Sequence, residues 1–253
     1  LMAGASSLLL DEHLAAGDVR FVDEVLASTA GKRLKGLAER WFKDTRPFAR
    51  EALHRYIGDG CDRPHHRPLV KALFKLAERA GDDDAMAHFM VAFDRLQKRT
   101  IRTVQQWDWR RNEYSKSVAV DPDRTVRLTS RGESDPRFSR RTRSYLQRRA
   151  FRYFRRIGAV DPARYGRAIR IALALYQDAH LDSAQKLLDS WGLVHALYGR
   201  SPVLARVPRG IVLAPGRALS ELQPAPIHPE GWQGCLGDLV TLLKKAQSRT
   251  VRV

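Results

Sequence analysis

The segment "RPLVKALFKLAERAGDDDAMAHFMVAFDRLQKR", residues 67–99, predicts two helices joined by a tight turn. Pro68 stands in the first turn of the first helix, where a missing amide proton is harmless, and Gly81 follows the last residue of that helix. The acidic residues 82–84 then open the second helix, because negative charge is favourable at the positive end of the helix dipole. Two helices joined so closely run antiparallel, and this pair sets the pattern for the rest of the chain.

The same helical period recurs on both sides of this pair, with capping residues or glycines between successive helices. The other helical segments that we predict are 8–17, 19–28, 31–42, 44–57, 140–158, 163–179, 184–199 and 235–248. Antiparallel helices of this length joined by short turns are typical of α-helical solenoids and irregular helical bundles. The expected fold is therefore mostly α, with an N-terminal helical scaffold over residues 1–103 and an arginine-rich helical region over 137–253.

Two stretches depart from the helical period. Residues 104–136 contain the short alternating pieces "SVAV" and "TVRLT" joined by "DPD", which predicts a small β-hairpin or a loop insertion that links the two helical regions. Residues 201–232 hold six of the twelve prolines and the strand-like "GIVLAPG", so this Pro-rich segment excludes long helices.

The C-terminal phrase "LLKKAQSRTVRV", residues 242–253, resembles the HEAT class of helical repeats, in which one helix ends and the next begins around a Val-Arg pair. The resemblance implies that the helix pairs stack as a HEAT-like solenoid. No clean internal period supports it elsewhere in the sequence. Because the chain stops where a further helix would begin, we expect it to be a fragment of a longer protein.

The charge of the chain is strongly positive and unevenly distributed. The 253 residues include 45 Lys and Arg against 28 Asp and Glu, a net charge of +17. Residues 1–100 carry a net charge of only +2, whereas residues 101–253 carry +15, and residues 137–170 contain twelve arginines and one acid. Such a concentration of charge favours a surface that binds a polyanion.

The composition also limits the cellular compartments in which we expect the protein. No uninterrupted apolar run approaches the roughly 18 residues that span a bilayer, and the N-terminal "LMAGASSLLL" lacks the basic start of a signal peptide. Two cysteines, Cys61 and Cys235, are too few for a disulfide framework. We therefore expect a cytoplasmic protein that does not associate with a membrane.

The segment "RRTRSYLQRRAFRYFRRIG", residues 140–158, predicts a helix with two opposed faces. One face, which we assign to the core, carries Leu146, Ala150, Tyr153, Phe154 and Ile157. The opposite, basic face carries Tyr145 among Arg141, Arg148, Arg149, Arg152, Arg155 and Arg156. Like charges one turn apart each cost about 0.2–0.5 kcal/mol, and no acid lies between residues 137 and 160 to offset them.

The basic face predicts a non-catalytic scaffold that binds the phosphate backbone of DNA or RNA. Guanidinium groups bind phosphate bidentately, and an aromatic ring such as Tyr145 offers a base a stacking surface. We expect two further segments to contribute: Trp109, Arg110 and Arg111 from the insertion, and Arg164 and Arg167 from the next helix.

Internal ion pairs or a protein partner could also account for the basic face. The arginines could pair with acids of neighbouring helices, for which the candidates are Asp82, Asp83, Asp84 and Asp178. The face could instead dock an acidic protein partner or another domain of a longer chain. Likewise, the aromatic and basic residues of the insertion could form a hairpin that covers the adjacent helix pair.

One stretch raises a metal site as an alternative. The segment "HRYIGDGCDRPHHRP" places His54, Cys61, His65 and His66 within thirteen residues, which are ligand types that zinc prefers. A plain turn between helices explains the same residues. The acids 82–84 could similarly suggest magnesium, but consecutive residues of a helix point in different directions. Since no nucleotide-binding or hydrolase motif occurs, we expect no catalytic centre and no cofactor.

Overall fold

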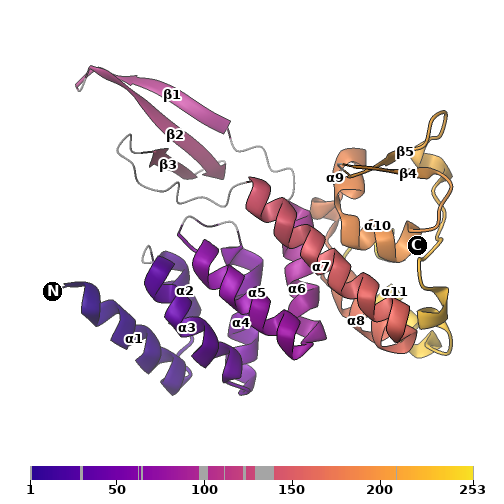
Figure 1. The fold of residues 1–253 in the computed structure, drawn as a ribbon, viewed down its shortest axis with the longest axis horizontal. Coiled ribbons are helices and arrows are strands. Elements are labelled where there is room, and N and C mark those ends of the chain that lie inside the picture. Colours follow the sequence, from indigo (N-terminus) through magenta and orange to yellow (C-terminus); the bar gives the residue numbers. More distant parts are fainter. Residues whose placement is uncertain are drawn as a thin grey trace.

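The computed structural model describes residues 2–252 except 29–30, 62, 64, 97–101, 111, 122–123, 129–139 and 209. The chain is mostly α-helical with small antiparallel sheets, as predicted. In Figure 1 the N-terminal helices pack in a row, α7 and α8 follow them, and the C-terminal elements lie at the far end. The helices of the first region are α1 (Met2–Ala16), α2 (Phe21–Ala27), α3 (Gly31–Lys43), α4 (Pro47–Gly60), α5 (Arg67–Ala80) and α6 (Asp83–Leu96).

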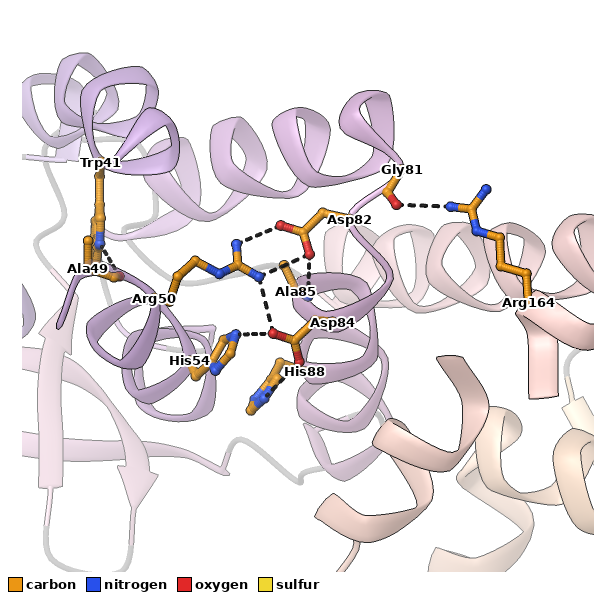
Figure 2. Close-up of polar contacts among 10 residues, drawn as sticks. All are labelled: Trp41, Ala49, Arg50, His54, Gly81, Asp82, Asp84, Ala85, His88 and Arg164. Carbon is orange, nitrogen blue, oxygen red and sulfur yellow. Dashed lines mark hydrogen bonds and ion pairs between the residues drawn. The ribbon is translucent and has the colours of Figure 1, made fainter. Parts of the chain in front are cut away.

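The N-terminal row is held together by a core of aromatic and aliphatic side chains. Phe21 of α2 meets Trp41 of α3 edge to face, with 4.8 Å between ring centroids. The indole Nε1 of Trp41 donates to the carbonyl of Ala49 in α4 at 3.0 Å, so the one polar atom of this buried ring is satisfied (Figure 2). The two interactions fix α2, α3 and α4 relative to one another.

The predicted turn between α5 and α6 is confirmed. Gly81 ends α5 in the left-handed conformation at φ 66°, which glycine adopts without strain. Asp82 Oδ1 then accepts a hydrogen bond from the amide of Ala85 at 3.0 Å and so caps the start of α6. Of the three consecutive acids, Asp82 and Asp84 both contact Arg50, whereas Asp83 pairs with Arg164 of a later helix.

The predicted β insertion is also confirmed, and it contains one strand more than a hairpin. Strands β1 (Arg102–Asp108), β2 (Glu113–Asp121) and β3 (Arg124–Leu128) form an antiparallel sheet in sequence order. Trp107 of β1 lies opposite Tyr114 of β2 in the register. Asp121, the last residue of β2, pairs with Arg124, the first residue of β3, while the other two residues of the "DPD" stretch lie outside the described residues.

The second helical region is built around α7 (Arg140–Val160), which packs against α6 and against α8 (Pro162–Leu175). The apolar face predicted for the arginine-rich helix is buried as expected: Leu146, Ala150, Tyr153, Phe154 and Ile157 all belong to the core. Asp161 separates the two helices and caps α8 by accepting a hydrogen bond from the amide of Arg164 at 2.9 Å.

The Pro-rich segment contains no α-helix among its described residues. It forms a hairpin of β4 (Leu204–Val207) and β5 (Gly210–Leu213) and two 3-10 turns, η2 (Leu219–Glu221) and η3 (Pro229–Trp232). The remaining elements are η1 (Asp178–His180), α9 (Ala184–Asp189), α10 (Trp191–Tyr198), α11 (Leu236–Lys245) and α12 (Arg249–Arg252). Helix α11 thus ends at Lys245, and the short helix α12 begins at Arg249. The stacking of helix pairs as a HEAT-like solenoid stays a prediction.

Candidate anion-binding surface

The outward side of α7 carries the predicted basic residues. Arg148, Arg152, Arg155 and Arg156 are exposed, and Tyr145 among them is 42% exposed. This orientation follows from the helix period, because burying the apolar side against α6 and α8 turns the arginines toward solvent. We call Tyr145 and these four arginines the arginine face.

The arginine face borders an open pocket of about 560 Å³. The residues that line it are Glu78, Tyr145, Arg149, Arg152, Tyr153, Arg155, Arg156 and Ala159. Apart from Glu78, which comes from the last turn of α5, every one of these residues belongs to α7. The pocket is therefore a basic depression along one helix, closed on one side by a single carboxylate.

Arg149 lines this pocket, but its charge is already paired with an acid. Its Nε donates to Glu78 Oε1 at 2.9 Å, and its Nη2 donates to the second oxygen of the same carboxylate. The guanidinium carbon also lies 5.8 Å from the ring centroid of Phe74. Because Glu78 accepts these hydrogen bonds, it raises the pKa of Arg149, and the guanidinium stays charged under all ordinary conditions.

Arg149 also orients Tyr145. Its Nη1 donates to the Tyr145 hydroxyl at 2.9 Å, and its guanidinium carbon lies 5.9 Å from the centroid of the tyrosine ring. The ring is thus held from its polar end while nearly half of its surface remains accessible. Such a ring is available for stacking with little further loss of side-chain entropy.

The four exposed arginines have no acidic partner in the described part of the chain. Arg148 Nε donates to the carbonyl of Ser144 at 3.1 Å, and Arg152 Nε donates to the carbonyl of Arg148 at 3.3 Å. These contacts hold the two side chains along the helix without neutralising them. Arg155 and Arg156 form no ion pair with any described residue.

The acids considered as internal partners are mostly engaged elsewhere. Asp82 pairs with Arg50, Asp84 contacts Arg50 and His54, and Asp178 lies 3.5 Å from Arg249 Nε. Internal neutralisation therefore accounts for Arg149 and for Arg164, which pairs with Asp83, but not for the four arginines of the arginine face.

Asp83 ties three helices together beneath the pocket. Arg164 Nε of α8 donates to Asp83 Oδ2 at 2.8 Å, and the hydroxyl of Tyr153 in α7 donates to Asp83 Oδ1 at 2.6 Å. Arg164 Nη2 additionally donates to the carbonyl of Gly81 at 2.9 Å (Figure 2). Burial and the neighbouring carboxylate raise the pKa of Tyr153, so its hydroxyl remains a donor. Arg164 thus positions helices, while Arg167 is exposed on α8 and lies outside the pocket lining.

The insertion residues do not join the pocket lining. Trp109 is 86% exposed, and its ring centroid lies 6.1 Å from that of Trp107, so the Trp109 side chain does not cover a helix pair. Arg110 is exposed at the same turn. Arg111 lies outside the described residues, and so does the side chain of Arg141, whose backbone belongs to α7.

The Cys61, His65 and His66 stretch serves as a helix connection. The buried His66 donates from Nε2 to the carbonyl of Ser28 at 3.1 Å, and its Nδ1 accepts from the hydroxyl of Tyr56 at 2.9 Å. Both ring nitrogens are therefore occupied and unable to bind a metal. Within the described residues, the cluster with metal-ligand geometry contains His54, Asp84 and His88 instead.

Two residues that line the pocket, Tyr153 and Glu78, were not predicted from the sequence as site residues. Tyr153 lies at the border between the two faces of α7 and lines the pocket, although the sequence pattern assigns it only to the core. Glu78 reaches the site from a helix 71 residues away from Arg149 in sequence, and no local pattern signals that contact.

Comparisons with known proteins do not add to this description. No protein family, no curated protein and no solved structure matches the chain. Among the helices of the described part, none combines the length and the apolar character needed to cross a bilayer.

Proposed function

We propose that the protein is a non-catalytic helical scaffold that binds the phosphate backbone of DNA or RNA through the arginine face of α7. The observation that carries this proposal is the pocket, in which Arg152, Arg155 and Arg156 lie beside Tyr145 without an acidic partner among the described residues. A folded chain that keeps several like charges together and unpaired on one helix sustains a repulsion that a bound anion would remove.

The chemistry of the face suits a nucleic acid better than an isolated anion. Guanidinium groups donate in a fork that fits two phosphate oxygens, and arginines on successive turns of a helix meet successive charges of an extended polymer. Tyr145 adds a surface on which a base or sugar can stack. Because these contacts do not involve the edges of the bases, phosphate contacts supply most of the affinity, and binding is only weakly selective for sequence.

The use of the remaining charged residues supports the scaffold role. Arg50, Arg149 and Arg164 pair with acids and fix helices to one another. Cys61 and Cys235 are not joined by a disulfide, which is consistent with a reducing compartment such as the cytoplasm.

The salt dependence of binding tests the proposal. Fluorescence anisotropy with labelled single-stranded RNA, single-stranded DNA and duplex DNA should give an affinity that falls with salt concentration. Four exposed arginines predict a log–log slope of about −3 to −4, from about 0.7–0.9 per phosphate contact. The double variant Arg152→Glu and Arg156→Glu should lower both the affinity and the slope.

A charge-matched control separates the arginine face from net charge. Lys244 and Lys245 are exposed in the last turn of α11, which does not line the pocket, so Lys244→Glu with Lys245→Glu makes the same change in charge elsewhere. This control should bind nearly as well as the parent chain. Equal losses in the two double variants, or no binding of any nucleic acid at low salt, would overturn the proposal and leave an acidic protein partner as the explanation.

A further inference from the structure

Helices α4 and α6 bring two histidines and an aspartate together on the side of the row shown in Figure 2. Asp84 and His88 stand one turn apart on α6, and His54 faces them from α4. His54 Nε2 lies 2.9 Å from Asp84 Oδ2, and His88 Nε2 lies 3.9 Å from Asp84 Oδ1. The three potential ligand atoms all lie within 4.8 Å of one another.

The two imidazoles are stacked in parallel. Their centroids are 3.9 Å apart and their planes differ by 11°, so both rings present the same edge toward the carboxylate. His54 Nε2 is shielded from solvent and lies 2.9 Å from Asp84 Oδ2, as a dashed line marks in Figure 2. A metal ion held by both groups would take the place of a proton between them.

These distances are near those that a metal site requires. Tetrahedral zinc with bonds of about 2.0–2.1 Å holds its nitrogen and oxygen ligands about 3.3 Å apart. The separations from the Asp84 oxygens, 2.9 Å to Oδ2 for His54 and 3.9 Å to Oδ1 for His88, lie on either side of that value, so small adjustments of the three side chains would complete the geometry. All three residues retain partial exposure, which gives an ion access from solvent.

Arg50 completes the surroundings as an orienting group. Its guanidinium donates to both oxygens of Asp82, at 2.6 and 3.0 Å, and to Asp84 Oδ2 at 3.2 Å. Oδ1 of Asp84 therefore remains for the ion, and the carboxylate of Asp82 offsets the charge of Arg50. Hydrogen bonds of this kind to a ligating carboxylate fix its orientation in metal sites.

We propose that His54, Asp84 and His88 bind a divalent transition-metal ion, with Zn²⁺ preferred, and that water fills the fourth position. Two imidazoles and one carboxylate form a donor set that zinc sites with an open position use. The site lies between α4 and α6, apart from the arginine face, so the proposal is independent of nucleic-acid binding.

The test measures binding of Zn²⁺ alone to the full chain after treatment with a chelator. Isothermal titration calorimetry should give one ion per chain. Replacing a ligand, in His54→Gln, His88→Gln or Asp84→Asn, should weaken binding on the order of 100-fold, since outer-shell changes alone cost 10–100-fold. The control His65→Gln, from the stretch that sequence spacing singles out, should leave the affinity unchanged.

A second readout keeps the test independent of folding defects. Zn²⁺ should raise the midpoint of thermal unfolding of the parent chain and of His65→Gln, but not that of the ligand variants. Co²⁺ in place of Zn²⁺ should give the strong visible absorption of a four-coordinate site. Binding below one ion per chain in the parent protein, or a stoichiometric site that survives both His54→Gln and Asp84→Asn, would overturn the proposal.

Discussion

Gln147 of α7 donates from Nε2 to Asp94 Oδ1 of α6 at 2.8 Å, inside the core where the two halves of the chain meet. The other oxygen of Asp94 accepts from the hydroxyl of Tyr176 at 2.6 Å and from the amide of Gly192 at 2.8 Å. One buried carboxylate therefore joins α6 to α7, to the end of α8 and to the start of α10. This network fixes how the arginine face is presented.

The ionisation of Asp94 should be visible in the pH dependence of stability. Burial raises the pKa of Asp94 to about 6, although Tyr176, Gln147 and Gly192 donate to it and oppose the shift. The folded state therefore binds a proton more readily than the unfolded chain. The contribution of Asp94 to stability is complete below about pH 4 and declines by about 3 kcal/mol as the pH rises to about 6.

Asp94→Asn isolates that contribution. The asparagine does not titrate, so the free energy of unfolding of the parent protein, relative to the variant, should fall between about pH 4 and pH 6 and then level off. Urea unfolding followed by circular dichroism measures both chains across this range. Parallel stability curves for parent and variant would show that Asp94 titrates normally.

Gly166 should tolerate no side chain. A Cβ atom at this position of α8 would lie 2.0 Å from the carbonyl oxygen of Gly231 in η3, and that oxygen belongs to the backbone. Gly166→Ala must therefore displace η3 from α8, and we expect a loss of about 1–3 kcal/mol in the free energy of unfolding.

Gly237→Ala is the matched control for that substitution. A Cβ at Gly237 in α11 meets nothing within 4 Å, so alanine should stabilise the helix by about 0.5–1 kcal/mol through backbone entropy. Thermal unfolding of the two variants should shift in opposite directions. Tolerance of Gly166→Ala would mean that η3 does not pack tightly on α8.

The two faces of α7 could be predicted from sequence because a helix fixes the direction of each side chain relative to its neighbours. The partner of each arginine could not be predicted from the sequence. Arg148 and Arg149 are adjacent and identical in type, yet only Arg149 meets Glu78, because that depends on where α5 ends against α7.

The metal-ligand cluster illustrates the same limit. Asp84 and His88 stand four residues apart on one predicted helix, which is a local signal, but the third member comes from a different helix. Sequence spacing instead associated His54 with Cys61, His65 and His66. Proximity along a chain is a weak guide where two helices pack side by side, because His54 and Asp84 meet across the α4–α6 contact although another helix separates them in sequence.

Alanine substitutions at Arg149 and Arg152 should distinguish an arginine that stabilises the fold from one that binds nucleic acid. Arg149→Ala leaves the carboxylate of Glu78, which is only 17% exposed, without its guanidinium, and should cost about 1–3 kcal/mol of unfolding free energy. Arg152→Ala removes an exposed side chain without an acidic partner among the described residues and should change stability by less than about 0.5 kcal/mol.

Binding measurements complete the comparison of these two arginines. Arg152→Ala should reduce the salt slope of nucleic-acid binding by about 0.7–0.9, the value of one phosphate contact. Denaturant unfolding and anisotropy of both variants check the two outcomes. An Arg149→Ala variant as stable as the parent, or an Arg152→Ala variant with an unchanged slope, would contradict the division of roles.

Tyr145 should contribute to affinity through its ring and not through charge. Tyr145→Ala removes the stacking surface and should weaken binding to single-stranded nucleic acid by about 1–3 kcal/mol while the salt slope stays constant. Tyr145→Phe keeps the ring but loses the hydrogen bond from Arg149, so it should retain most of the affinity. Duplex DNA, whose bases are already stacked, should discriminate little among the three proteins. Equal affinity of the alanine and phenylalanine variants for single strands would show that the ring contacts no base, and that the arginines alone hold the polymer.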